Sequence, residues 1–367
     1  MSVARDVDVD VGHILAHQHA SGAYPASPSF SQYPHAWLRD GSFVAYAMDR
    51  AGEHESAARF HAWVAGTLLR YEREVEALLE GARRGEAPDE FGFLPARFGV
   101  DGSWRHDGWP NFQLDGYGHW LWSLGEHRRL APRPAAGNEV DRAAALVGRY
   151  LVTFWHEPCY DAWEEFRSQL HTSTLASIHA GLRALQGDAG SSGDTGVPGA
   201  GAAVDEIERV ILGECLVSGR FVKHVGNPAV DASLLWLATP FAVLPEGDAR
   251  VRATVLEIER ALVVDGGLTR YAADTFYGGG AWILLTAWLG WYHARAGDTE
   301  RAGACLAWVE ARRGADGALP EQVSTARSIE RFVRHWTARW GPSASPLLWS
   351  HAMALVLRRE LGIPARA

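Results

Sequence analysis

Two short segments of the sequence carry carboxylates in settings where they could act as an acid and a base. Residues 160–165 read Tyr-Asp-Ala-Trp-Glu-Glu and place Glu164 directly beside Glu165, whereas residues 317–322 read Gly-Ala-Leu-Pro-Glu-Gln and hold one carboxylate, Glu321. Cleavage of a glycosidic bond requires two carboxyl groups, one protonated to release the leaving oxygen and one ionised to activate water. We therefore interpret the two segments as the halves of a sugar-cleaving site.

The adjacent carboxyls of Glu164 and Glu165 are suited to hold a proton between them. Like charges at short range disfavour double ionisation, and the neighbouring indole of Trp163 excludes water, so one of the two carboxyls is expected to stay protonated near neutral pH. Glu321 lies in a turn between a proline and a glutamine, which suits the base. A glutamate taken alone is usually a solvated surface charge, so this interpretation depends on the surrounding motifs.

Three other segments combine aromatic rings with carboxylates and, in two of them, an arginine: residues 33–40, 109–118 and 269–282. Aromatic faces stack on the C–H groups of sugars, and arginine and aspartate form charge-assisted hydrogen bonds with hydroxyls. Asp40 and Asp115 could each instead cap the helix that follows. Because all three segments lie at the expected starts of helices, we favour one shared carbohydrate pocket.

The composition indicates a globular protein and argues against nucleic-acid binding. The chain has 367 residues, 47% hydrophobic and 22% charged, which is typical of a globular protein with one large domain or two ordinary ones. Its net charge of -9 argues against a nucleic-acid surface, because phosphate binding requires clustered cations. The only lysine, Lys223, is interpreted as a compositional bias toward arginine.

The cysteines and histidines predict neither a metal nor a cofactor. The three cysteines lie far apart without Cys-x-x-Cys spacing, which argues against a disulfide framework and a zinc site. His13 and His17 are spaced i, i+4, but no third ligand or His-Glu-x-x-His motif accompanies them. His351 is interpreted as a buried supporting residue and not as a catalyst.

The sequence also bears on location and partners. It contains no run of about 18 apolar residues, so no membrane span is expected. The N-terminus carries alternating acids in place of the apolar core of a signal peptide, so we expect a cytoplasmic protein. The expected partner is a small oligosaccharide, with neither nucleic acid nor membrane, and the oligomeric state is left open.

Hydrophobic spacing predicts a chain made almost entirely of helices. The expected helices cover residues 12–20, about 40–48, 54–83, 114–129, 138–156, 172–185, 202–217, 230–238, 248–263, 280–296, 299–313 and 345–361. Residues 281–289 are apolar on nearly all sides, which predicts an inner helix, whereas 299–313 is amphipathic. Residues 84–113 form a long loop, and 187–201 form a low-complexity tether. The pattern predicts an all-α toroid of paired helices, with long loops at one rim and one domain over residues 1–367.

Six motifs, in this order, resemble those of the glucoamylase-type inverting hydrolases of glycoside hydrolase family 15. They span about residues 30–355 and read Trp37-Leu-Arg39-Asp40, Gln113-Leu-Asp115-Gly-Tyr-Gly, Tyr160-Asp161-Ala-Trp163-Glu164-Glu165, Arg270-Tyr271 with Asp274 and Trp282, Leu319-Pro-Glu321-Gln322, and Pro346-Leu-Leu-Trp349-Ser350-His351-Ala352. The family's fold is an (α/α)6 barrel of six inner and six outer helices, which agrees with the helix pattern.

The resemblance implies a role for each matching residue. Glu164 would be the general acid and Glu321 the general base, while Glu165 would bind substrate at the entrance. Arg39 and Asp40 would hold the hydroxyls of the terminal glucose. Arg270 would bridge the sugars on either side of the cleaved bond. The other residues expected to bind substrate or shape the pocket are Tyr33, Trp37, Trp109, Gln113, Asp115, Asp161, Trp163 and Trp282.

Departures from the family narrow the expected substrate. The sequence shows no β-sandwich ahead of the barrel and no starch-binding module, and residues 166–169 differ from the form associated with starch-degrading members. Similarity to compact intracellular members favours α-1,6 disaccharides such as isomaltose, with release of β-glucose from non-reducing ends. The alternatives are an α-1,4-preferring glucoamylase and a trehalase of the family. Two further alternatives are a sugar epimerase on a similar toroid and a sugar-binding protein without catalysis.

Overall fold

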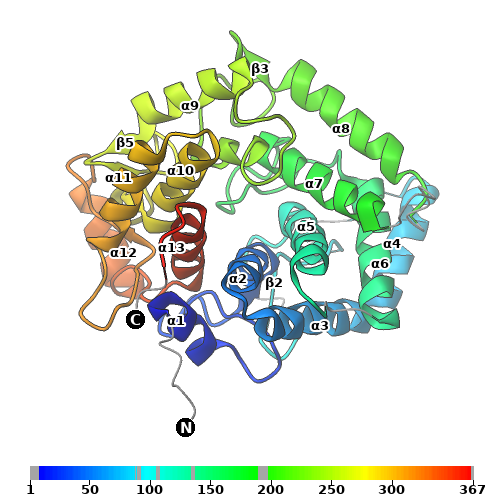
Figure 1. The fold of residues 1–367 in the computed structure, drawn as a ribbon. Helices are drawn as coiled ribbons and strands as arrows, with labels where there is room; N and C mark the ends of the chain where they lie inside the picture. The colour runs from blue at the N-terminus through cyan, green and yellow to red at the C-terminus, as the bar shows by residue number, and fades with distance from the viewer. Residues whose placement is uncertain are drawn as a thin grey trace.

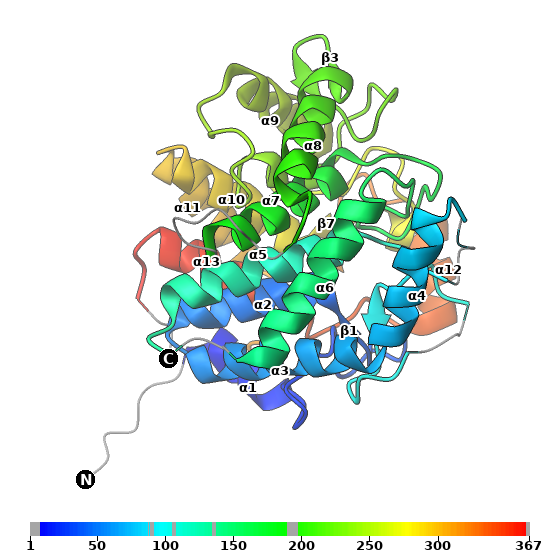
Figure 2. The same ribbon diagram turned by 90° about the vertical axis from the view of Figure 1, so that its right-hand side faces the viewer.

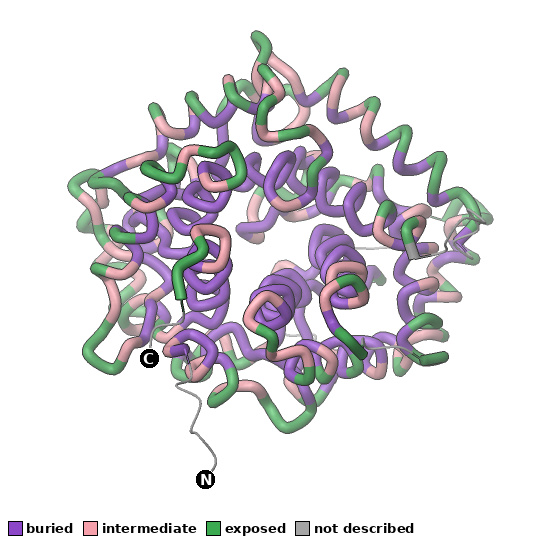
Figure 3. Tube along the Cα trace, viewed as in Figure 1, coloured by how far each residue is buried: buried purple, intermediate pink, exposed green. Residues whose placement is uncertain are grey.

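The helices form two concentric rings in a computed structural model of the protein (Figure 1). The structure describes residues 8–86, 88, 92–104, 108–133, 137–188 and 197–364. Helices of the inner ring are buried on almost every side, and those of the outer ring are buried only where they face inward (Figure 3). This division follows the sequence, because a helix that is apolar all round must be covered by other helices.

Six helices close the inner ring. They are α2 (Leu38–Ala51), α5 (Asp115–Leu130), α7 (Thr172–Asp188), the short 3-10 helix η2 (Ala232–Leu237), α10 (Ile283–Arg295) and α13 (Leu348–Glu360). Each contacts the next in this order, and α13 returns to contact α2. The ring is therefore closed by contact between elements from opposite ends of the chain.

Six further helices form the outer ring. They are α1 (Val9–His17), α3 (His54–Arg70), α6 (Asn138–Phe154), α8 (Ala200–Glu214), α9 (Ala249–Leu262) and α11 (Thr299–Glu310). Along the chain each is followed by one inner helix, and Figure 2 shows α6 in front of the inner ring, with α3 below it and α8 above it. The predicted (α/α)6 barrel is confirmed in the described part of the chain.

Two helix predictions differ in detail from the structure, and one helix was not predicted. The expected helix 54–83 is divided at Tyr71, where the backbone leaves helical geometry, into α3 and α4 (Glu72–Arg83). The expected helix 230–238 is only the 3-10 helix η2. Helix α12 (Glu330–Trp340) was not predicted, because it is a short helix without a buried residue and most of its side chains are charged or polar. Most of the predicted tether 187–201 lies outside the described residues.

Very short strands connect the loops at one end of the barrel. β1 (Ala36–Trp37) pairs with β2 (Arg97–Phe98), and β3 (Leu216–Val217) pairs with β4 (Arg220–Phe221). An antiparallel ladder joins β5 (Val263–Val264), β6 (Gly267–Leu268), β7 (Ala281–Trp282) and β8 (Gln322–Val323). The described residues contain no β-sandwich. Among them, no helix is both long and apolar enough to traverse a lipid bilayer.

Helices α5 and α7 approach so closely that two glycines are needed at their contact. A Cβ atom on Gly118 would lie 2.4 Å from the carbonyl oxygen of Ser177, and a Cβ atom on Gly181 would lie 2.6 Å from the carbonyl oxygen of Gly118. Both obstacles are backbone atoms of the neighbouring helix, so the two inner helices would have to separate to admit a methyl group.

The substitution Gly118→Ala is therefore expected to destabilise the protein by about 2 kcal/mol despite the better helix propensity of alanine. Urea unfolding monitored by circular dichroism would measure the change. Gly66→Ala is the matched control, since Gly66 is also helical and a Cβ atom there would meet nothing within 4 Å. Equal stability of the two variants would contradict the close packing of α5 on α7.

Candidate active site

A cavity of about 310 Å³ opens at the end of the barrel where α2, α10 and α13 begin. Its walls are rich in aromatic rings, with charged side chains among them. The lining residues are Ala26, Tyr33, Trp37, Arg39, Asp40, Trp109, Pro110, Ala162, Trp163, Glu164, Glu165, Arg270, Thr275, Phe276, Trp282, Glu321, Trp336, Trp340, Leu347 and Trp349. The two segments interpreted as acid and base thus meet at one cavity.

Glu164 lies in a turn whose backbone adopts a left-handed conformation at this residue, with φ of 66°. Its carboxylate accepts hydrogen bonds from the indole N–H groups of Trp37 and Trp109, both at 2.6 Å, and from the amide of Gln113 at 3.2 Å. Burial raises the pKa of the Glu164 carboxyl, and nearby Arg39 and the hydrogen bonds from Trp37 and Gln113 oppose this rise. Left-handed backbone at a non-glycine residue is uncommon and tends to occur at functional sites.

The effect expected of the adjacent carboxyl is not what the structure shows. Glu165 turns to a different set of partners: its carboxylate accepts a hydrogen bond from the hydroxyl of Tyr271 and lies 3.7 Å from an Nη atom of Arg270. The raised pKa of Glu164 therefore arises chiefly from burial and not from repulsion by its neighbour. Adjacency in sequence did not indicate which groups each side chain would contact.

Glu321 is almost completely buried, with 2% of its surface exposed. Its carboxylate accepts hydrogen bonds from the hydroxyl of Ser343, at 3.3 Å, and from the hydroxyl of Tyr33. Burial raises the pKa of Glu321 to about 7, and the charge of Arg270 opposes a larger rise. The charges of both Glu164 and Glu321 raise the pKa of Tyr33, after burial itself, so this hydroxyl lies near both carboxyls.

Arg39 and Asp40 face the cavity, whereas two other predicted binding residues lie behind them. Arg39 Nη1 donates to Gln113 Oε1 at 2.8 Å and to Asp115 Oδ2 at 3.0 Å. Gln113 and Asp115 thus orient the arginine and are not among the lining residues. Asp40 is not the capping residue of α2, since Trp37 holds that position without a side-chain bond.

The buried atoms Arg39 Nε and Asp40 Oδ2 lie 3.7 Å apart, and neither makes a hydrogen bond with the described residues. Burial raises the pKa of Asp40 to about 7 against the charge of Arg39. Buried polar atoms are normally satisfied by a partner, so a donor and an acceptor left at a cavity wall suit the hydroxyl groups of a bound sugar.

Arg270 also lines the cavity and is surrounded by aromatic rings. Its guanidinium binds the carboxylate of Asp274, with Nε at 2.7 Å from Oδ2. The rings of Trp163 and Trp282 lie 5.5 and 5.2 Å from its central carbon. This arrangement fixes the orientation of the cation, because a guanidinium packed between rings and paired with a carboxylate has little freedom to move.

Sequence reasoning missed the buried cation beneath the turn of Glu164. Lys223 Nζ lies 3.1 Å from Asp161 Oδ2 and 2.9 Å from Asp231 Oδ2. The other oxygen of Asp161 accepts the backbone N–H groups of Trp163, at 3.0 Å, and of Glu165, at 2.9 Å. Asp161 thus holds the turn from behind and does not line the cavity. The only available signal was that this is the sole lysine of the chain.

Further wall residues were missed because their helix was not predicted. Trp336 and Trp340 of α12 line the cavity, and their rings lie 4.7 Å apart. Phe276, in the 3-10 helix η3 (Phe276–Gly278), also lines the cavity, and its ring lies 5.2 Å from that of Trp336. The sequence alone gives no signal that a tryptophan on a short exposed helix lines a pocket.

One group among the described residues has the side chains to hold a metal ion. The ligand atoms of Asp49, His61 and His127 all lie within 4.8 Å of one another, and all three residues are buried. Asp49 is near the opposite end of α2 from Arg39, roughly 15 Å along the helix axis at 1.5 Å per residue. This group is therefore separate from the cavity. His13 and His17 are not part of it.

Comparisons with known proteins agree with these features. The family model described as "Glycosyl hydrolases family 15" matches residues 11–341. An isomaltose glucohydrolase from Kribbella flavida is 46% identical over 352 residues, which cover 95% of this chain and 91% of that protein. A solved glycosidase variant in complex with glucose is 44% identical, with a TM-score of 0.90 over 97% of this chain and 96% of that chain. A bacterial glucoamylase complexed with acarbose shares the fold at 19% identity, with a TM-score of 0.73 over 97% of this chain and 56% of that chain.

Replacing the buried lysine tests its role beneath the turn. Lys223→Met leaves two buried carboxylates without their cation, so we expect a loss of about 3 kcal/mol in the free energy of unfolding. Urea unfolding would measure this loss. Arg220→Met removes a positive charge from a half-buried position close in sequence, whose side chain donates to the carbonyl of Pro228 at 2.9 Å and, within the described part of the chain, makes no hydrogen bond to the turn of Glu164. We expect that control to change stability by less than about 0.5 kcal/mol; similar values for both variants would contradict the role of Lys223.

Replacing Glu321 by glutamine tests the cost of burying its carboxyl. Because its pKa is raised to about 7, the folded protein binds this proton more tightly than the unfolded chain does. The resulting stability is complete below the ordinary pKa of 4.5 and is lost as the pH rises through about 7, by up to about 3 kcal/mol. Glutamine cannot ionise, so the Tm of Glu321→Gln should increasingly exceed that of the wild type between about pH 5 and pH 8. Thermal unfolding across this range measures the difference, and a pH-independent difference would contradict the raised pKa.

Proposed function

Because the chain belongs to glycoside hydrolase family 15, we propose that it is an inverting, exo-acting α-glucosidase that releases β-glucose from the non-reducing ends of short α-glucosides. One observation carries the proposal: Glu164 and Glu321, which are distant in the sequence, line the same aromatic cavity. Inverting hydrolysis requires this arrangement, with an acid and a base on opposite sides of the cleaved bond.

In the proposed reaction Glu164 protonates the glycosidic oxygen as the bond to the terminal sugar breaks. The indole N–H groups of Trp37 and Trp109 bind the carboxylate that remains after the proton has left. Hydrogen bonds to a charged form stabilise that form, so these donors favour the direction of proton transfer. Burial counteracts them by raising the pKa, and the acid can thereby retain its proton until the substrate is bound.

Glu321 accepts a proton from the water that attacks the sugar from the other side. Its pKa of about 7 makes it a stronger base than a solvated glutamate, and the hydroxyls of Tyr33 and Ser343 orient it. The product is the inverted β-anomer, because the water enters on the face opposite the leaving oxygen.

The terminal glucose is proposed to bind between the aromatic walls and the pair Arg39 and Asp40. Both residues present a polar atom that makes no hydrogen bond with the described residues, and Asp115 orients Arg39 from behind. Arg270 and Glu165 lie on the side of the cavity where the second sugar would bind. Trp37, Trp109, Trp163 and Trp282 supply the apolar surface for the sugar rings.

We further propose isomaltose and related α-1,6 glucosides as substrates. The 46% identity to an isomaltose glucohydrolase, over 91% of that protein, supports this linkage over α-1,4 glucosides and trehalose.

The continuous hydrophobic core, which runs from Val11 to Leu357, supports one catalytic domain over the whole chain. A sugar epimerase is not favoured, because that chemistry requires paired histidines and no histidine is among the lining residues. A sugar-binding protein without catalysis is not favoured either, because it would tolerate loss of an acid, whereas both proposed catalytic carboxyls, Glu164 and Glu321, line the cavity.

Substitution of each proposed catalytic carboxyl tests the function. Glu164→Gln and Glu321→Gln should each lower kcat on isomaltose by about 10³-fold or more, since proton transfer by a positioned side chain contributes factors of this order. Glu300→Gln, an exposed position in the first turn of α11, is the control and should retain full activity. The assay should compare isomaltose, panose, maltose and trehalose, and NMR should identify the first anomer released. Initial release of α-glucose, or normal turnover by either active-site variant, would contradict the proposal.

A further inference from the structure

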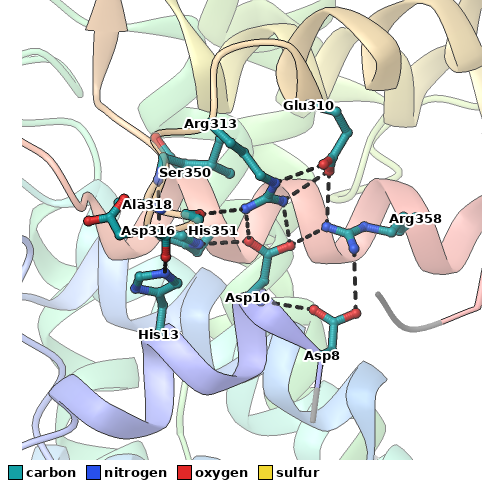
Figure 4. Close-up of polar contacts among 12 residues, drawn as sticks. Asp8, Asp10, His13, Glu310, Arg313, Asp316, Ala318, Ser350, His351 and Arg358 are labelled. Carbon is teal, nitrogen blue, oxygen red and sulfur yellow. Dashed lines mark hydrogen bonds and ion pairs between the residues drawn. The ribbon is translucent and has the colours of Figure 1, made fainter. Parts of the chain in front are cut away.

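A buried chain of hydrogen bonds connects the N-terminal helix to the loop that carries Glu321 (Figure 4). Asp10 of α1 is completely buried, and its Oδ1 lies 2.7 Å from Nδ1 of His351 on α13. On the other side of the same ring, Nε2 of His351 accepts the backbone N–H of Leu319 at 3.0 Å. Leu319 precedes Glu321 by two residues, so the chain of contacts ends next to the proposed base.

These contacts determine the protonation of His351. A peptide N–H can only donate, so Nε2 must carry the lone pair that accepts from Leu319. The single proton of the neutral ring is then on Nδ1, from which it is donated to the carboxylate of Asp10. Burial lowers the pKa of His351, which agrees with a neutral ring. Only this one tautomer satisfies both neighbours.

The carboxylate of Asp10 is itself fixed by two arginines. Both terminal nitrogens of Arg313 donate to it, each at 2.8 Å, and Arg358 also donates to Oδ2. Both arginines also donate to Oε1 of Glu310, Arg313 at 2.9 Å and Arg358 at 3.0 Å. A carboxylate oxygen of Asp8 lies 3.6 Å from Nη1 of Arg358. Burial opposes ionisation of Asp10, but the bonds from His351 and Arg313 outweigh it and hold its pKa at about 2.

Further side chains bind other backbone atoms of the loop that carries Glu321. The hydroxyl of Ser350, beside His351, donates to the carbonyl of Pro320 at 2.8 Å, and Arg313 Nη1 donates to the carbonyl of Gly317 at 3.0 Å. His13 of α1 stacks on the ring of His351, with centroids 4.5 Å apart, and its Nε2 lies 3.2 Å from the carbonyl oxygen of Asp316. The loop is thus bonded on several sides immediately before the base.

From these contacts we infer that Asp10 and His351 are positioning residues for the general base. They hold the backbone at Leu319 so that the carboxyl of Glu321 faces the cavity, although neither side chain lines the cavity itself. The inference rests on the proposed function, because it assigns a purpose to the orientation of Glu321. Buried charge networks are costly to form, and this one adjoins a catalytic loop, where a displacement of about 1 Å can lower a rate about 10²-fold.

Two substitutions of His351 distinguish its hydrogen bond to Asp10 from its hydrogen bond to Leu319. Asparagine can place an amide N–H near the position of Nδ1 and keep the bond to Asp10, but it cannot reach Leu319. Glutamine can place a carbonyl oxygen near the position of Nε2 and keep the bond to Leu319. We expect His351→Asn to lower kcat on isomaltose by about 10- to 100-fold with KM changed less than about threefold, and His351→Gln to restore most of the loss.

A merely structural role would give a different result. His293→Asn is the matched control, because His293 is also buried and also binds a carboxylate, Glu259, at 3.0 Å, but lies in the last turn of α10, whereas the cavity opens where α10 begins. It should lower Tm while leaving kcat of the folded protein unchanged. If His351→Asn behaves in the same way, with kcat intact and only Tm lowered, the inference is wrong.

A second variant keeps the inference testable if His351→Asn does not fold. Ser350→Ala removes the hydroxyl that donates to the carbonyl of Pro320. This variant should lower kcat about fivefold or more at unchanged KM. Amide hydrogen exchange should be faster in a peptide covering residues 314–322. Wild-type kcat and exchange in this variant would overturn the inference. Failure of the wild type to hydrolyse any α-glucoside would instead overturn the proposed function, so the two failures are distinguishable.

Discussion

Two carboxyl groups that line one aromatic cavity, those of Glu164 and Glu321, impose the constraint on which the rest of the structure depends. A carboxylate removed from water loses hydration that only nearby donors and cations can replace. Indole N–H groups bind Glu164, while Arg270 lies close enough to lower the pKa of Glu321. The inner helices α2, α10 and α13 also begin at this end of the barrel, so the positive ends of their dipoles face the buried charges.

Support for the cavity is arranged in two layers. Each cation that faces the cavity is paired with a carboxylate on its far side, as Arg39 is with Asp115 and Arg270 with Asp274. Lys223 lies below the turn of the proposed acid, and His351 lies below the loop of the proposed base. The groups that would touch substrate are therefore oriented before it binds, and the hydrogen-bonding capacity facing the cavity remains available for hydroxyls.

Closure of the helical ring makes this arrangement possible. Loops from distant hairpins meet only because α13 packs against α2, which brings the two ends of the chain together. Helix α1 then covers this junction and reaches the loop of Glu321 through Asp10. The N-terminal helix is consequently part of the support of the site, although no residue of α1 lines the cavity.

Much of this protein could be derived from its sequence, because helix periodicity, loop composition and ordered motifs are local properties of the chain. They predicted the paired-helix barrel, the inner position of the helix at 281–289 and a pocket containing Trp37, Arg39 and Arg270. Only the tertiary structure decided that Glu165 turns away from Glu164, that Gln113 and Asp115 lie behind Arg39, and that Lys223 and His351 contact the segments that carry the proposed acid and base. Those outcomes depend on contacts between residues far apart in sequence, and such contacts exist only after the ring has closed and removed the charged groups from water.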